Sequence, residues 1–276
     1  MRRCILAFLL FALLLPCTGN ASQTTPRILA GTSIVADILS DLTGPEAKVQ
    51  QLIPGGACPG HYDLRPGDLI FLEKADLLVL EGYQPNMSNM TNLIQAADNR
   101  KLQTLVLPKI YNSMLPSAQI TYTERLATEL AKLFPAMASS VDKAAAKRID
   151  MIRTKASREA ARLRPAKDVP TLCAAMQKGF ASWAGLKVVG TYGRPEDLSP
   201  SAYGKLLTLG KDNHVRLVLD NLQSGPNAGA GIAESLQAGH ADLTSFPGAL
   251  PGQDGWAAAF TANTQKLLDA LAEAGK

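Results

Sequence analysis

Residues 137–164 read MASSVDKAAAKRIDMIRTKASREAARLR, and this stretch sets the arrangement of the rest of the chain. It contains neither glycine nor proline and is rich in alanine, lysine and arginine, which favour helix. The apolar residues Ile149, Ile152 and Leu163 recur at helical spacing, and Pro165 follows directly. At about 1.5 Å per residue the helix would be roughly 40 Å long, enough to cross a small domain. We therefore expect a rigid helix that joins two halves of the molecule.

Short apolar runs alternate with helical patterns on both sides of this stretch. Before it, we expect strands at residues 27–30, 49–53, 77–80 and 102–107, and helices at 33–42, 68–74, 87–97 and 121–133. After it, we expect strands at 169–173, 187–189, 215–219 and 243–246, and helices at 174–184, 200–209, 228–238 and 256–274. Strands that alternate with helices predict mostly parallel sheets with helices on both faces. The expected fold class is α/β: two α/β lobes joined by a long rigid helix, with a ligand cleft between them at the carboxyl ends of the strands.

The beginning of the chain has the features of a secretory signal peptide. Arg2 and Arg3 precede an apolar run at residues 5–15, and small residues lead to Ala21, after which we expect cleavage. The alternative is cleavage before Cys17, which would produce a lipoprotein. Both alternatives place the protein in the periplasm. The expected organisation is a signal peptide at 1–21, an N-terminal lobe at 22–136, the linking helix at 137–164 and a C-terminal lobe at 165–276.

The composition argues against several classes of function. The formal net charge of +4 becomes +2 once Arg2 and Arg3 leave with the signal peptide, which is too little to indicate nucleic-acid binding. The sequence contains no G-x-S-x-G, P-loop or H-E-x-x-H motif and only three histidines, so an enzyme would have few groups to work with. We therefore expect a monomeric binding protein without catalytic activity.

Residues 55–68 carry a resemblance to a known family. They read Gly-Gly-Ala-Cys-Pro-Gly-His-Tyr-Asp-Leu-Arg-Pro-Gly-Asp, which resembles the loop G-A-x-P-H-x-Y-x-x-x-P-S-D of zinc- and manganese-binding ABC transporter proteins. Residues 74–79 and 180–189 resemble later segments of the same family, the periplasmic metal-ion solute-binding proteins. The resemblance implies two α/β lobes around a metal-ion cleft. It also implies zinc as the most common ligand, and delivery of the ion to an ABC permease in the inner membrane.

The residues at the family's metal-binding positions differ in this chain. Without gaps, the first family histidine falls on Gly60, next to His61, and the second falls at residues 112–114. The third falls near residues 173–176, and the acidic ligand falls at residues 245–246. The metal site that the resemblance implies is therefore divergent.

Cysteine, histidine and methionine near these positions are the candidate ligands for a metal ion. The candidates are Cys58, His61, Met114, Cys173 and Met176. Cys58 and His61 have the spacing of a metal-binding pair, and Asp63 is placed to orient His61. Thiolate, thioether and imidazole form a soft donor set, which suits Cu(I) or tightly held zinc.

Three alternatives use the same features differently. Cys58 and Cys173 would form a disulfide between the lobes if their Cα atoms were about 4.4 to 6.8 Å apart. A cleft opened by glycines, such as Gly60 and Gly225, would suit haem or a metal chelate. The third alternative is a homologue that no longer transports and binds no metal.

Overall fold

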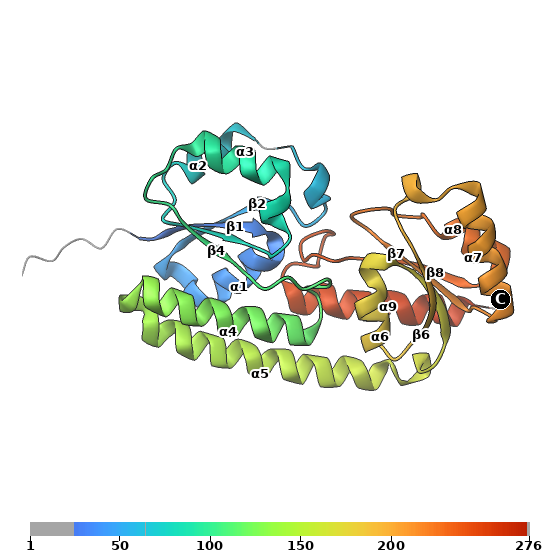
Figure 1. The fold of residues 1–276 in the computed structure, drawn as a ribbon. Helices are drawn as coiled ribbons and strands as arrows, with labels where there is room; N and C mark the ends of the chain where they lie inside the picture. The colour runs from blue at the N-terminus through green and yellow to red at the C-terminus, as the bar shows by residue number, and fades with distance from the viewer. Residues whose placement is uncertain (1–24, 64, 275–276) are drawn as a thin grey trace, which may run out of the picture.

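The structure consists of two α/β lobes that are joined along one side by long helices (Figure 1). It is a computed structural model that describes residues 25–63 and 65–274. The expected signal peptide at residues 1–21 therefore lies outside the described residues. None of the helices in the described part combines the length and the hydropathy that a bilayer span requires.

The N-terminal lobe is built on a parallel sheet with the strand order β2-β1-β3-β4. Its strands are β1 (Arg27–Thr32), β2 (Lys48–Ile53), β3 (Leu77–Leu80) and β4 (Gln103–Val106). Its connecting helices are α1 (Ser33–Thr43), α2 (Pro66–Leu72) and α3 (Ser88–Ala97), with 3-10 turns at Gly44–Glu46, Pro59–His61 and Gln84–Asn86. All four residues of β3 are buried, as expected for an interior parallel strand that is covered on both faces.

The C-terminal lobe repeats this topology with the strand order β6-β5-β7-β8, again all parallel. Its strands are β5 (Pro170–Ala174), β6 (Lys187–Tyr192), β7 (Leu217–Asn221) and β8 (Gly239–Leu243). Its helices are α6 (Lys178–Trp183), α7 (Pro200–Asp212), α8 (Ala230–Leu236) and α9 (Trp256–Glu273), with 3-10 turns at Arg164–Ala166, Ala175–Gln177 and Pro195–Asp197. The predicted α/β fold of two lobes with parallel sheets is confirmed.

Several elements have other bounds than the sequence-based expectation, and β8 and α4 are two of them. The last strand was expected at residues 243–246, whereas β8 begins at Gly239 and ends at Leu243. A Cβ atom at position 239 would lie 1.8 Å from the carbonyl oxygen of Ala270 in α9, so only glycine allows the helix to pack this closely. Helix α4 (Pro116–Leu133) begins earlier than residue 121, with Pro116 in its first turn, where a missing N–H costs nothing.

The long linking helix is α5 (Ala138–Arg162), which a 3-10 turn at Pro135–Met137 connects to α4. Its 25 residues span about 37 Å. Figure 1 shows α4 and α5 side by side beneath the N-terminal lobe, with α5 continuing beneath the C-terminal lobe. A continuous hydrophobic cluster includes Ile34 of α1, Ile152 of α5 and Leu217 of β7, so the lobes share one core. Two smaller clusters cover the opposite faces of the sheets.

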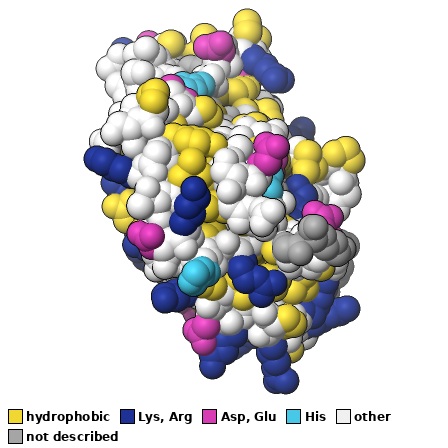
Figure 2. All heavy atoms as spheres, turned by 90° about the vertical axis from the view of Figure 1, so that its right-hand side faces the viewer, with side chains coloured by type: hydrophobic (Ala, Val, Ile, Leu, Met, Phe, Trp, Pro, Cys, Tyr) yellow, Lys and Arg dark blue, Asp and Glu magenta, His cyan; other side chains and the backbone are white. Residues whose placement is uncertain are grey.

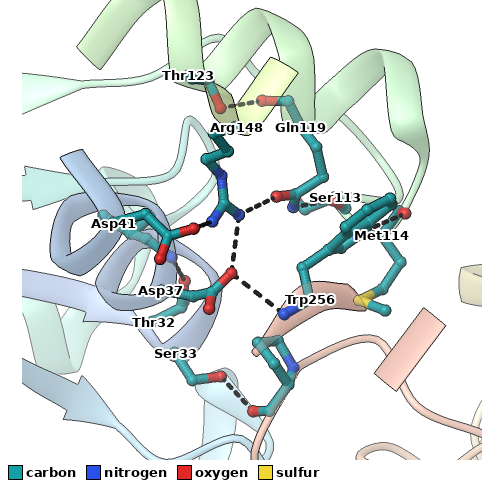
Figure 3. Close-up of polar contacts among 12 residues, drawn as sticks. Thr32, Ser33, Asp37, Asp41, Ser113, Met114, Gln119, Thr123, Arg148 and Trp256 are labelled. Carbon is teal, nitrogen blue, oxygen red and sulfur yellow. Dashed lines mark hydrogen bonds and ion pairs between the residues drawn. The ribbon is translucent and has the colours of Figure 1, made fainter. Parts of the chain in front are cut away.

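Arg148 of α5 forms a buried polar cluster with three neighbouring helices (Figure 3). Its side chain is 2% exposed and pairs with Asp37 at 2.7 Å and with Asp41, both on α1. It also donates to Oε1 of Gln119 on α4 at 2.9 Å. Asp37 Oδ2 accepts a further hydrogen bond from the backbone N–H of Trp256, the first residue of α9, at 3.1 Å. One carboxylate thus connects α1, α5 and the N-terminus of α9, where negative charge is favourable.

Aromatic side chains extend this junction towards the C-terminal lobe. The indole N–H of Trp256 donates to the carbonyl oxygen of Met114 at 2.8 Å. The Trp256 ring stacks on Phe260 with 4.7 Å between centroids, and Phe260 meets Phe180 of α6 edge-on at 5.7 Å. The junction therefore combines charge pairing with aromatic packing.

The charged side chains on the outer face of the C-terminal lobe are of both signs (Figure 2). Basic side chains are most frequent at the lower edge of this view, and they also occur among the acidic and apolar groups over the rest of the face. This distribution differs from the continuous basic stripe that is typical of nucleic-acid-binding surfaces.

We predict that Arg148→Met lowers the free energy of unfolding by about 3 kcal/mol, because it leaves Asp37 without its buried partner. Urea denaturation of the mature protein measures this change. Arg125→Met is the matched control, since Arg125 forms an exposed pair with Glu129 on α4 and its loss should cost under about 1 kcal/mol. Equal stability losses in the two variants would contradict the role assigned to Arg148.

Candidate functional site: a cavity between the lobes

A cavity of about 350 Å³ lies between the lobes, at the carboxyl ends of the strands of both sheets. The loops that follow β2 to β8 all contribute lining residues. The N-terminal lobe provides residues 58–60, 83, 87 and 109–113, and the C-terminal lobe provides residues 176, 194, 221, 223, 224, 245 and 246. This is the position where ligands bind in open α/β sheets.

The four segments to which the family resemblance assigned metal-binding positions all reach this cavity. Gly60 comes from the first segment, Asn112 and Ser113 from the second, and Met176 from the third. Residues 245–246 complete the set. Segments that are far apart in the sequence therefore line one cavity.

The loop after β2 carries Cys58 and His61 at the edge of the cavity. Cys58 precedes the 3-10 turn Pro59–His61 and is partly buried, while His61 is exposed. The side-chain amide of Asn89 holds this turn by donating to the carbonyl oxygens of Pro59 and Tyr62, both at 3.1 Å. The loop also contacts the other lobe, because Gln223 donates to the carbonyl oxygen of Gly55 at 2.8 Å.

Arg194, in the loop after β6, reaches across the cavity to both of these residues. Its Nη1 lies 3.2 Å from Nε2 of His61, and its Nη2 lies 3.6 Å from Sγ of Cys58. A guanidinium group can only donate hydrogen bonds, so Nε2 of His61 is the acceptor in this contact. The same tautomer would present a nitrogen lone pair to a metal ion. Asp63, which was expected to orient His61, is exposed, and the partner that the structure gives His61 is Arg194.

The charge of the cavity lining is positive. Lys109 and Arg194 belong to the lining, and the lining formed by the described residues includes no aspartate, glutamate or histidine. A divalent cation in the cavity would therefore be repelled by two positive groups unless one of them moved or was neutralised.

Glu81 lies beneath the cavity at the carboxyl end of β3 and is fully buried. It accepts hydrogen bonds from Thr32 at 2.8 Å, from the hydroxyl of Tyr83 at 3.2 Å, and from Ser113. Burial raises the pKa of the Glu81 carboxyl, and the hydroxyl donors partly oppose that rise. Burial and the neighbouring Glu81 also raise the pKa of Tyr83. Tyr83 and Ser113 line the cavity, so the hydrogen bonds to Glu81 hold the hydroxyl groups of these two lining residues in place.

The remaining candidate ligands lie in different environments. Met176 lines the cavity and is 49% exposed, whereas Met114 and Cys173 are fully buried in the core shared by the lobes. Burial raises the pKa of the Cys173 thiol to about 12, so it is not a thiolate at neutral pH. Both Cys58 and Cys173 are free thiols in the structure.

A second group of potential ligands lies in the C-terminal lobe. Asp220, His240 and Asp242 bring ligand atoms within 4.8 Å of one another. The oxygens of buried Asp220 already accept hydrogen bonds from the Tyr192 hydroxyl at 2.5 Å, from the Gly229 N–H and from His240 at 2.6 Å. The hydrogen bond to Asp220 raises the pKa of His240, while partial burial opposes the rise. This group is a satisfied internal network and does not line the cavity.

Arg194 and Lys109 are the charged residues of the lining, and sequence reasoning missed both. Both lie in loops that directly follow a strand, β6 for Arg194 and β4 for Lys109. The rule that places ligands at the carboxyl ends of parallel strands would have indicated them. Basic side chains are not metal ligands, so a search for donor atoms does not select them.

The fold and the cavity are those of a two-lobed α/β protein with a cavity between its lobes. The family model for the periplasmic zinc-uptake complex component A (ZnuA) matches residues 28–270. The chain therefore belongs to the ZnuA family, which confirms the family resemblance stated from the loop at residues 55–68.

Individual relatives are more distant. The chain is 30% identical over 90 residues to the manganese ABC transporter substrate-binding lipoprotein scaA of Streptococcus gordonii, and this match covers 30% of the chain and 29% of that protein. The curated relatives that it matches are covered over 29% to 42% of their own length. It superposes on a crystal structure of ZnuA with a TM-score of 0.73 at 20% identity, covering 90% of this chain and all of that one. It superposes on FpvC from Pseudomonas aeruginosa in complex with Mn²⁺ with a TM-score of 0.76 at 20% identity, covering 91% and 100%.

The raised pKa of His240 predicts a pH-dependent contribution to stability. Because the folded pKa lies above the reference value of 6.5, the pairing with Asp220 stabilises the fold fully below that pH and is lost as the pH rises through the folded pKa. His240→Gln should therefore cost on the order of 1 kcal/mol near pH 6 and less at alkaline pH. Denaturation curves from about pH 5.5 to about pH 9 measure the difference in free energy of unfolding between wild type and His240→Gln. His214→Asn, at an exposed histidine, is the control. A difference that grew with rising pH for His240→Gln would contradict the assignment.

Proposed function

We propose that this protein is the extracytoplasmic solute-binding component of a metal-ion ABC transporter. The observation that carries the proposal is the convergence of all four predicted ligand segments on one cavity between two rigidly joined lobes. Membership of the ZnuA family supports a metal ion as the cargo more than haem, a metal chelate or the loss of binding. The proposed role is binding and delivery, without catalysis.

The proposed ligands are Cys58 and His61, with Met176 as a third donor from the opposite side of the cavity. Cys58 and Met176 line the cavity, and His61 adjoins Cys58 through the turn at Pro59–His61. Met114 and Cys173 no longer belong to the proposed set, because they lie in the core. A thiolate, an imidazole and a thioether suit zinc or Cu(I) better than manganese. Zinc is the first choice because the family is one of zinc uptake.

The proposed partner is an ABC permease in the inner membrane, and the proposed location is the periplasm. The scaA relative, a substrate-binding lipoprotein of a manganese ABC transporter, supports an extracytoplasmic location. The positive residues at 2–3 and the apolar run at 5–15 support export.

We predict that Cys58→Ser and His61→Ala each weaken zinc binding at least about tenfold, because each removes one donor atom. Competition with a chromophoric zinc chelator measures the dissociation constant of the purified mature protein. Cys173→Ala is the matched control, since it removes a thiol from the core and should leave zinc affinity unchanged. Unchanged affinity in both Cys58→Ser and His61→Ala would rule out this ligand pair.

A further inference from the structure

Arg194 contacts the proposed ligand pair from the opposite lobe. The backbone before its side chain is held firmly, because the Arg194 N–H donates to Asp197 at 3.2 Å. The next residue, Pro195, packs closely on Gly225. A Cβ atom on residue 225 would lie 2.7 Å from Cδ of the Pro195 ring. The base of the loop is therefore fixed, and the long side chain is the part that can move.

The guanidinium contacts both of the donor atoms proposed for the metal ion. Both soft donors on this loop, Sγ of Cys58 and Nε2 of His61, face Arg194 at 3.6 Å and 3.2 Å. A Cβ atom at Gly60 would be 3.7 Å from Nη2, an ordinary contact distance, so position 60 lies directly beside the guanidinium. Position 60 is also where the family resemblance places a metal-binding histidine. A protein cation thus lies beside the donors that the proposed function assigns to a metal cation.

Arg194 has a second partner outside the cavity. Its Nη1 lies 3.8 Å from Oε1 of Glu196, whose side chain is 58% exposed. Such an exposed pair is weak, but it offers a place for the guanidinium when it leaves Cys58 and His61. In the structure the same Nη1 atom lies near both His61 and Glu196, so Glu196 remains within reach of the guanidinium when it moves away from the two donors.

We propose that Arg194 is a resident cation that competes with the metal ion for Cys58 and His61, and that metal binding displaces it and releases its contact between the lobes. The inference rests on the proposed function, because it assumes that the metal binds to this pair. Two like charges at contact distance in a partly buried site repel strongly, so the guanidinium and the metal ion exclude each other. Arg194 then sets an affinity threshold, since only a cation that binds thiolate and imidazole tightly can replace it.

The test compares zinc affinity in wild type, Arg194→Gln and Arg216→Gln, all as the purified mature chain. Arg216→Gln is the matched control, because Arg216 is an exposed arginine of the same lobe outside the cavity lining, and both variants lose one positive charge. We expect Arg194→Gln to bind Zn²⁺ at least about tenfold more tightly than wild type. Arg216→Gln should match wild type. The NMR signals of the Arg194 guanidinium, identified by their loss in Arg194→Gln, should shift when Zn²⁺ saturates the wild type.

Each outcome bears on a definite claim. Equal or weaker zinc binding by Arg194→Gln would overturn the competition while leaving the proposed function in place. Tighter binding by Arg216→Gln to the same degree would reduce the effect to net charge and also overturn it. An Arg194 signal that zinc leaves unmoved would overturn the displacement. Failure of both wild type and Arg194→Gln to bind zinc would overturn zinc as the cargo, and the inference with it.

Discussion

The pairing of Arg148 with Asp37 and Asp41 is the contact on which the placement of the two lobes depends. Apolar surfaces can slide over one another at small cost, whereas a buried charge must keep its partners or lose several kcal/mol, on the order of 3 to 5. Asp37 serves the linking helix α5 and the first N–H of α9 at once. A shift of either helix along the other would leave this carboxylate or Arg148 unpaired. The cluster therefore selects one register among several that hydrophobic packing alone would allow.

With the helices in that register, the carboxyl ends of the strands of both sheets face the same cavity. Within each sheet all strands run parallel, so the loops that end them lie along one edge. Helices α5 and α9 join the lobes on one side, and the two loop-bearing edges meet across the cavity. The contact between Gly239 and α9 shows how closely the last helix fits its sheet. The site is therefore a consequence of topology together with one fixed interlobe geometry, and its chemistry depends on the residues that each loop carries.

The sequence predicted the lobes and the linking helix because their signals are local. Apolar runs such as β3, and a stretch free of glycine and proline such as α5, specify their elements without reference to the rest of the chain. The orientation of Cys173 could not be predicted in this way. In β5 the residues Thr171 to Ala174 are all buried, so alternation does not reveal which side chains face the cavity. The contact of Arg194 with the loop after β2 depends on tertiary placement over more than 130 residues of sequence, which no local pattern encodes.

The same rigidity limits how the protein can respond to its ligand. A hinge motion of whole lobes would have to break the core that runs from α1 through α5 to β7, and would separate Asp37 from Arg148. The loops at the cavity have fewer such constraints: His61 is exposed, Met176 is half exposed, and Tyr111 is 86% exposed. We therefore infer that ligand binding changes loops and side chains at the cavity edge more than the angle between the lobes. A partner that distinguishes the metal-bound from the metal-free form would then have to contact the cavity edge, because the two forms differ mainly in that part of the surface.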